Sequence, residues 1–511
     1  MNILAHGTQL HMAAPLGRRA AQALLLALLL LLAATGAHAQ SPGDDVGDAG
    51  AAAVIPVNIC LPDQLPLSGT QARAVNSEPA LSYNGDRAAF WSTANPMGSN
   101  GDGSIEVFTG IIEKPDAAGV FTPTVAQLTE SRGNILGGFN IMPDVAFATL
   151  SNVSSTFTVF ASDRDLAPTA TMNNADGGFE IFIARRTGST VTIAQLTNGR
   201  GNASILPSMS NLYPESSPRY VNIAFVSDAD DKGRGRNAVP VGLAGNSNYE
   251  LYAMKLDMSV WPPKPVGSVM QVTQTANDVT NDKPAMSSNG NAIVFLSDGK
   301  APLRPASGAA TRDNNREVFR VLLPSTFTAN AALTFTQVTN TGVDNGTIID
   351  NDNPDCNADG TRVVFSSTEQ SITNATPNAG KSIVYLSNLT GAAPTYLAVS
   401  NALKVSGNPA FTAKEPALSG VGDRIVFAAD ACAVANLPDC AQNTGEFQVF
   451  VAERDVATGA VLVAQVTNEL TATHEAPAIS GDGRFVALVK SEGNATVNPD
   501  LSGSEVAILY C

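Results

Sequence analysis

The sequence predicts an all-β protein built from one repeated unit, and three observations lead to that prediction. A twelve-residue phrase, P-x-x-S-x-x-G-x-x-x-x-[FL], recurs in one register at residues 79–90, 284–295, 354–365, 416–427 and 477–488. The chain contains 43 glycines and 30 prolines, which favours many turns and few long helices. Further strand signals follow each phrase in a fixed order, as a repeat array requires.

Each copy of the phrase predicts a β-hairpin. Proline opens a short strand, Asn-Gly or Asp-Gly supplies the turn in four copies, and an apolar strand follows. The turn glycine, for example Gly290, is expected to adopt a positive φ, because it has no Cβ to clash. Asn357 replaces the serine in the third copy.

Four strand signals follow one another in each unit, and we name them a to d. Strand a opens with the proline phrase, and strand b is an apolar run such as 223–228 or 293–298. Strand c reads Glu-aliphatic-Phe/Tyr at 106–108, 180–182, 250–252 and 317–319, with looser forms at 382–385, 448–450 and 505–510. Strand d carries Gln-Leu/Val-Thr in five units and residues 396–399 in a sixth, with the period-2 pattern of a half-exposed outer strand.

Units two and three are degenerate in strand a, and we place their openings at Pro143 and Pro207. Seven anchor prolines then recur every 61 to 77 residues. A four-stranded antiparallel unit cannot bury both of its faces alone, but repetition around an axis buries each sheet between its neighbours. The sequence therefore predicts a single seven-bladed β-propeller of four-stranded antiparallel blades.

The ends of the chain are expected to close this ring. The seventh unit lacks a strand d, and the isolated strand signal at 57–61 is predicted to supply it, which removes an exposed sheet edge. Five cysteines suggest a disulfide between Cys60 and Cys511 that joins the chain ends, and another between Cys432 and Cys440 within one repeat. Cys356 is left as the odd thiol.

The N-terminal region predicts export. Arg18 and Arg19 precede an apolar run that ends in a small-x-small cleavage site, so residues 1–39 are predicted to be a signal peptide. Residues 40–56 are expected to be a flexible linker, and 57–511 the propeller domain. No second apolar run follows, so we expect no membrane span after cleavage and a periplasmic or secreted product.

Charge limits the partners that we expect. Cleavage of residues 1–39 would change the net charge from −16 to −18, because two arginines and no acidic residue are removed. Such a chain is a poor partner for nucleic acid.

The repeats resemble those of TolB-like, WD-repeat-like bacterial propellers. The resemblance rests on the Pro-x-x-Ser-x-Asp/Asn-Gly phrase, the Phe-x-Ser-Asp ending of strand b and the Gln-Leu-Thr of strand d, and it covers about residues 57–511. It implies a propeller whose blades follow the strand order described above.

One face of the predicted ring carries long connections. In an up-and-down blade the b–c and d–a connections emerge on one face, and the b–c loops are long at, for example, 164–178, 229–247 and 299–315. Insertions gathered on one face are typical of a binding face, although neutral loop drift would give the same pattern. Acidic residues gather there, and Asp344, Asp350, Asp352 and Asp355 are candidate calcium ligands, with solvated turns as the alternative.

Candidate catalytic groups are few. After signal cleavage His474 is the single histidine, which argues against a histidine-rich metal site, and we expect it in a surface turn. Carboxylate-pair chemistry needs no histidine and stays open. Trp91 is expected in the core, and Trp261 is expected to pack or to form an exposed contact.

The sequence favours an exported, non-enzymatic propeller that binds a protein or envelope component through its loop-rich face, with no cofactor besides a possible calcium ion. The alternative is a carbohydrate hydrolase or lyase that uses carboxylates near the central channel. The sequence identifies neither the partner nor the oligomeric state.

Overall fold

The structure is a computed structural model of the chain. It describes residues 65–66, 75–112, 124–131, 138–167, 169, 173–199, 203–213, 218–228, 248–276, 278–304, 312–328, 331–344, 347–369, 372, 381–403, 411–430, 446–455, 460–467, 472–492 and 504–511. All of them belong to one compact unit, Ala51–Cys511. The predicted signal peptide and linker lie outside the described residues.

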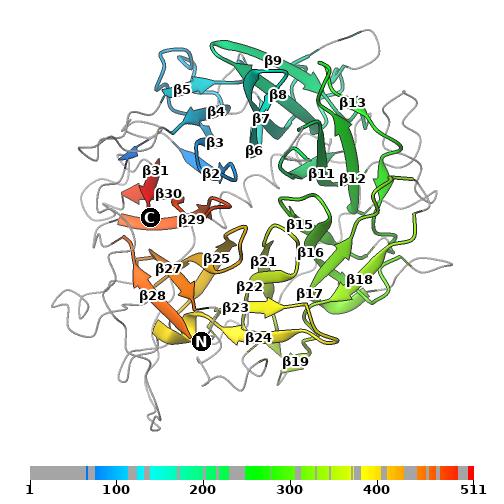
Figure 1. The fold of residues 1–511 in the computed structure, drawn as a ribbon, viewed down its shortest axis with the longest axis vertical. Coiled ribbons are helices and arrows are strands. Elements are labelled where there is room, and N and C mark those ends of the chain that lie inside the picture. The colour runs from blue at the N-terminus through cyan, green and yellow to red at the C-terminus, as the bar shows by residue number, and fades with distance from the viewer. Residues whose placement is uncertain are drawn as a thin grey trace, which may run out of the picture. The chain divides into compact units, whose positions relative to one another are not determined.

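Seven antiparallel sheets, which we call blades 1 to 7 in chain order, are arranged in a ring (Figure 1). Blade 1 consists of β2 (Asn76–Leu81), β3 (Arg87–Ser92), β4 (Glu106–Ile111) and β5 (Thr124–Gln127). Blade 2 consists of β6 (Asn140–Leu150), β7 (Val153–Ser162), β8 (Glu180–Thr187) and β9 (Thr190–Gln195). Blade 3 consists of β10 (Ser204–Met209), β11 (Tyr220–Ser227), β12 (Glu250–Asp257) and a split outer strand, β13 (Lys264–Pro265) and β14 (Met270–Gln271).

The remaining blades follow the same order. Blade 4 consists of β15 (Asn281–Met286), β16 (Ala292–Gly299), β17 (Arg312–Leu322) and β18 (Thr334–Gln337). Blade 5 consists of β21 (Asn351–Cys356), β22 (Arg362–Ser367), β23 (Ile383–Asn388) and β24 (Thr395–Ala398). Blade 6 consists of β25 (Ala413–Leu418), β26 (Arg424–Ala429), β27 (Gln448–Arg454) and β28 (Val461–Gln465). Blade 7 consists of β29 (Ala472–Ile479), β30 (Phe485–Glu492), β31 (Ser504–Tyr510) and β1 (Leu65–Pro66). A small hairpin, β19 (Val343–Asp344) and β20 (Thr347–Ile348), and a 3-10 turn, η2 (Ser400–Leu403), complete the described elements.

The predicted seven-bladed propeller is confirmed, including its closure by an N-terminal strand. Leu65 and Pro66 pair with Ile508 and Ala507 of β31, so the last sheet mixes strands from both ends of the chain. The segment 57–61, which we expected in this role, lies outside the described residues.

Two of the five cysteines, Cys356 and Cys511, lie among the described residues. Cys511 is disulfide-bonded, and its partner lies outside the described residues, as do Cys60, Cys432 and Cys440. The two predicted pairings therefore stay predictions. Cys356 is a free, buried thiol.

An aromatic pair at the centre of each of the first six blades explains the recurring Phe of strand b and Phe or Tyr of strand c. In blade 1 Phe90 lies opposite Phe108, and their ring centroids are 5.6 Å apart. The same stacked pair recurs with centroid distances of 5.7 to 5.9 Å in the next five blades, as Phe160–Phe182, Phe225–Tyr252, Phe295–Phe319, Phe365–Tyr385 and Phe427–Phe450. Cross-strand aromatic pairs of this kind stabilise a sheet beyond the area that they bury.

Buried polar groups connect neighbouring blades. Glu250 at the start of β12 accepts hydrogen bonds from the Thr273 hydroxyl (2.5 Å), the Thr275 backbone N–H (2.7 Å) and the side-chain amide of Asn281 (3.2 Å), and Asn281 begins the next blade. The same connection recurs around Glu106 with Asn140 and around Glu317 with Asn351. A buried carboxyl is tolerated only with such partners.

His474 does not lie in a surface turn, and that expectation is wrong. It is fully buried in β29, at the position that Asn140, Asn281 and Asn351 occupy in other blades. Gln448 replaces the glutamate of the preceding blade, and it accepts a hydrogen bond from Thr467 (2.9 Å). The sequence around His474 was ambiguous because a polar residue before the anchor proline suits both a turn and this buried position.

The a–b turns form a second connection around the ring. Backbone N–H groups donate to carbonyl oxygens of the following blade from Asn211 to Ser288, Asn289 to Ala358, Ala358 to Gly420, Gly420 to Gly481 and Asp482 to Tyr83, at 2.8 to 3.0 Å. Tyr83 packs against Gly420 and Gly481, where an added Cβ would lie 2.5 and 2.1 Å from its ring atoms. Blade 1 is thereby joined to blades 6 and 7 independently of β1.

Gly481→Ala is expected to destabilise the ring, because the new Cβ would overlap Tyr83. Overpacking of this kind typically costs about 1–3 kcal/mol. Urea denaturation should therefore show a lower midpoint for the variant. Gly101→Ala is the matched control, because nothing lies within 4 Å of a Cβ there, and an equal loss in both variants would contradict the role of Tyr83.

The stability of the protein is expected to fall as the pH rises from about 5 to 8. Burial raises the pKa of Glu180 to about 8, with partial compensation by hydrogen bonds from Thr197 and Gly199. Because the folded state binds the proton more tightly than the unfolded state, this stabilisation is complete below the unfolded pKa and is lost as the pH passes the folded one. Glu180 contributes about 2–4 kcal/mol to this change, on the scale of 1.36 kcal/mol per pKa unit.

Glu180→Gln should reduce the slope of this profile, because an amide does not titrate, while the raised pKa values of Asp144 and Asp355 leave a smaller slope. The free energy of unfolding at pH 5 and pH 8, measured by chemical denaturation, checks the expectation. Glu453→Gln is the control at an acidic side chain that is 44% exposed, and it should keep the wild-type slope. The same slope in Glu180→Gln as in the wild type would argue against Glu180 as the source.

Candidate functional site

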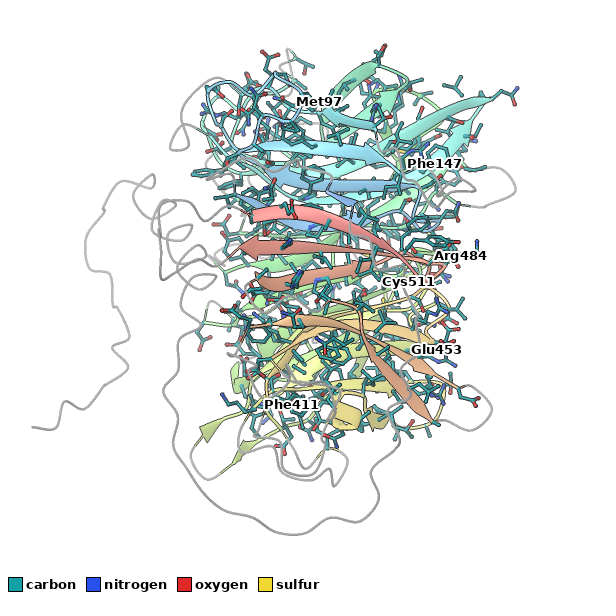
Figure 2. All side chains as sticks on the ribbon, turned by 90° about the vertical axis from the view of Figure 1, so that its left-hand side faces the viewer. Met97, Phe147, Phe411, Glu453, Arg484 and Cys511 are labelled. Atoms are coloured by element: carbon teal, nitrogen blue, oxygen red, sulfur yellow. The ribbon has the colours of Figure 1, made fainter. Side chains whose placement is uncertain are left out.

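The strongest candidate site lies where the seven inner strands begin. These are β2, β6, β10, β15, β21, β25 and β29, which line the centre of the ring (Figure 1). Each begins on the face that carries the d–a and b–c connections, and we call it the loop face. The opposite face carries the a–b and c–d turns, and we call it the turn face. Phe147, Glu453, Arg484 and Cys511 lie toward the turn face, on the right-hand side of Figure 2.

A bulge shapes every inner strand at its anchor proline. The residue before each proline has a positive φ of 45° to 57°, and the strand register shifts there in each blade: these residues are Glu78, Met142, Leu206, Lys283, Asn353, Glu415 and Ala476. Proline disfavours the right-handed helical region for the residue before it, and the bulge accommodates the extra residue. A left-handed non-glycine residue typically costs about 1–3 kcal/mol, so the packing of all seven blades must maintain it.

The bulge leaves two residues accessible in six of the seven inner strands, and one, Met142, in β6. In β15 and β21 the two residues before the proline are half-buried, whereas the proline and the asparagine three positions earlier are buried. Because neighbouring blades cover both faces of each sheet, the inner edge is the route by which these residues reach solvent.

Blades 4 to 7 place ionised side chains at these positions. Lys283 contacts Asp352 of the next blade at 2.7 Å, and Lys414 contacts Glu475 of the next blade at 2.7 Å. Arg316 contacts Asp282 at 2.8 Å. We call this group, together with Glu415, the charged sector. Its ion pairs are one-quarter to one-third exposed, so each stabilises the fold by no more than about 1 kcal/mol and stays open to a ligand.

Blades 2 and 3 place apolar side chains at the same positions. These are Ile141, Met142, Ile205 and Leu206, which we call the apolar sector, and all except Ile141 are half-buried. The loop-face end of the inner strands is therefore divided between an apolar part and a charged part.

Two carboxylates lie deeper on the inner strands, one residue after the anchor proline. Asp144 accepts hydrogen bonds from the backbone N–H groups of Val145 (2.8 Å) and Met209 (2.7 Å), and Asp355 does so from Cys356 and Leu418 (both 2.8 Å). Burial raises the pKa of each to about 6, and these hydrogen bonds oppose the rise. Each carboxylate thus accepts one hydrogen bond from the backbone of its own blade and one from the backbone of the next blade. Asp144 and Asp355 therefore have a structural role.

The four predicted calcium ligands stay a prediction, and the structure shows other contacts for two of them. Asp352 pairs with Lys283, Asp355 binds the backbone of blade 6, and the side chain of Asp344 lies outside the described residues. Asp350 is exposed, and partial desolvation followed by the nearby charge of Asp352 raises its pKa. Within the described ranges, no group of three or more His, Cys, Asp or Glu side chains could hold a metal ion.

Both tryptophans pack within the fold. Trp91 is buried, as predicted, and its Nε1 donates to Oε2 of Glu78 (2.9 Å) beside the candidate site. Trp261 lies against Phe157, and the Arg185 guanidinium lies 4.6 Å from its ring centroid, which agrees with the packing interpretation. The sequence patterns did not reveal the charged and apolar sectors, because most of their members share a position in the inner strand and not a residue type.

Comparison with known proteins gives similarities of fold. No protein-family model and no curated protein matches the chain. The chain is similar to the solved structure of TolB from Acinetobacter baumannii, with 13% identity over 73% of this chain and 80% of that one and a TM-score of 0.31. An oligogalacturonate lyase from Vibrio parahaemolyticus shows 10% identity over 88% and 92% of the two chains (TM-score 0.40), and a prolyl endopeptidase shows 10% over 82% and 45% (TM-score 0.41). At these values the similarities assign no substrate or partner.

Proposed function

We propose that this protein is an exported, non-enzymatic propeller that binds a protein or a cell-envelope component at its loop face. The observation that carries the proposal is the divided loop-face end of the inner strands. The charged sector offers both signs of charge at accessible positions, and the apolar sector offers half-buried aliphatic side chains beside it. Binding sites on proteins commonly combine apolar contact area with a few oriented polar groups.

The arrangement of the charges supports a macromolecular partner. Lys283 and Lys414 each join two blades, so the charges are spread over four blades. Charges spread over such a width determine orientation and specificity at an interface more than they determine affinity. The long b–c connections emerge on the same face, although most of their residues lie outside the described part of the chain.

Export is the second part of the proposal. It rests on the predicted signal peptide at residues 1–39 and on the disulfide at Cys511, since such bonds persist in oxidising compartments. Among the described residues, no helix is long and apolar enough to span a membrane. Periplasmic and secreted locations both fit these observations.

Neutralising the charged sector is expected to weaken partner binding. Asp352→Asn with Glu475→Gln removes one acid from each inter-blade ion pair while it keeps the side-chain shapes. Crosslinking and affinity capture from the native envelope should recover the partner of the wild type about fivefold less with this variant, which corresponds to about 1 kcal/mol.

Arg484→Gln is the matched control, because it changes a half-exposed charge on the turn face. It should capture the partner as the wild type does. Equal recovery by all three proteins would mean that the partner does not use the loop-face end of the inner strands.

A further inference from the structure

Arg87 and Arg186 lie near each other at the turn-face side of the interface between blades 1 and 2. Phe147, Thr156 and Arg186 lie directly opposite one another in the neighbouring strands β6, β7 and β8. Side chains at such paired positions point to the same face of the sheet. Arg87 of blade 1 lies over this row, with its Cζ 4.1 Å from the Phe147 ring centroid and its Nε donating to Oγ1 of Thr156 (3.0 Å).

Arg186 is buried without an acidic partner. Its residue exposure is 7%, and its Nε donates to the carbonyl oxygen of Gly188 (3.1 Å). Its Nη1 is buried and has no hydrogen-bond partner, and no carboxylate pairs with it among the described residues. Burial and the charge of Arg87 both lower its pKa. A buried charge without a counter-charge is costly, so an arginine in this position calls for an explanation.

The repeats show that the fold does not require an arginine here. Arg186 lies four residues after the strand-c aromatic, and the equivalent residues of blades 1, 3, 4 and 5 are Ile112, Leu256, Leu323 and Leu389. Blade 6 carries Arg454 there, and this arginine is half-buried. An aliphatic side chain fills the position in four blades, and the arginine of blade 6 is less buried, so packing alone does not account for a buried guanidinium in blade 2.

Arg87 also departs from its counterparts. Arg362 and Arg424 begin strand b in blades 5 and 6, and they donate to the carbonyl oxygens of Gly422 (2.9 Å) and Gly483 (3.0 Å) in the a–b turn of the next blade. In blade 2 the longer β6–β7 hairpin replaces that turn. Arg87 instead extends over Phe147, beside Arg186, and Asp86 contacts its Nη1 at 3.4 Å.

We propose that Arg186 and Arg87 bind a small oxyanion of the phosphate or sulfate type between blades 1 and 2. Guanidinium groups pair with such anions through parallel N–H donors, and Nη1 of Arg186 is a donor in need of an acceptor. The side chain of Arg87 is only 14% exposed, so we take the ligand to be a small anion. The bound anion would supply the counter-charge that Arg186 lacks, and it would connect the blade with the long hairpin to its neighbour.

The test is isothermal titration calorimetry of the full mature chain with sodium phosphate and with sodium sulfate. Ionic strength is held constant with sodium chloride, so that general screening does not contribute. The wild type should bind one anion with saturation, and Arg186→Leu, which installs the residue of blades 3 to 5, should bind at least tenfold more weakly. Saturation should also raise the melting temperature of the wild type by about 1–2 °C at ten times Kd.

Arg484→Gln, at an exposed arginine of the same face, should bind as the wild type does. If Arg186→Leu does not fold, Arg87→Gln provides the same comparison. The absence of saturable binding by the wild type at about 50 mM anion, where a millimolar site would be filled, would overturn the proposal, and so would equal affinity in Arg186→Leu. An effect that chloride reproduces would show screening instead of an oxyanion site.

Discussion

The burial of a glutamate at the start of strand c is the constraint on which the ring depends. Glu106, Glu250 and Glu317 each lie at the boundary between two blades, where hydrogen bonds from their own strand d and from the next strand a surround them. A sheet with two apolar faces could slide against its neighbour, whereas a buried carboxyl must meet its donors in one register. The aromatic pairs supply area, and these polar groups determine alignment.

The bulge at the anchor proline is the second shared feature, and it connects the fold to the candidate site. The proline limits the backbone of the preceding residue, and the extra residue places two side chains at the accessible inner edge. The backbone is thus common to all blades, while the side chains vary. The difference between the charged and apolar sectors arises because the side chains at these positions can vary from blade to blade.

Departures from the repeat mark the two places where we propose binding. The inner-strand members of the charged sector occupy positions that carry apolar residues in blades 2 and 3, and Arg186 is buried at a position that is aliphatic in four other blades. A repeat protein provides its own controls, because each blade shows what the fold requires at a position. Charges that the fold does not require, such as that of Arg186, are candidates for recognition.

The sequence by itself determined the number of blades, the order of four strands in each, and the closure of the last sheet by an N-terminal strand. Hairpin phrases, turn glycines and alternating strands are local patterns, and they survive in any context. Tertiary structure alone decided that His474 is buried, that Asp352 pairs with Lys283 while Asp355 binds the backbone of blade 6, and that Arg87 lies beside Arg186. These relations join residues of different blades, and the spacing within one repeat carries no information about which side chains meet across an interface.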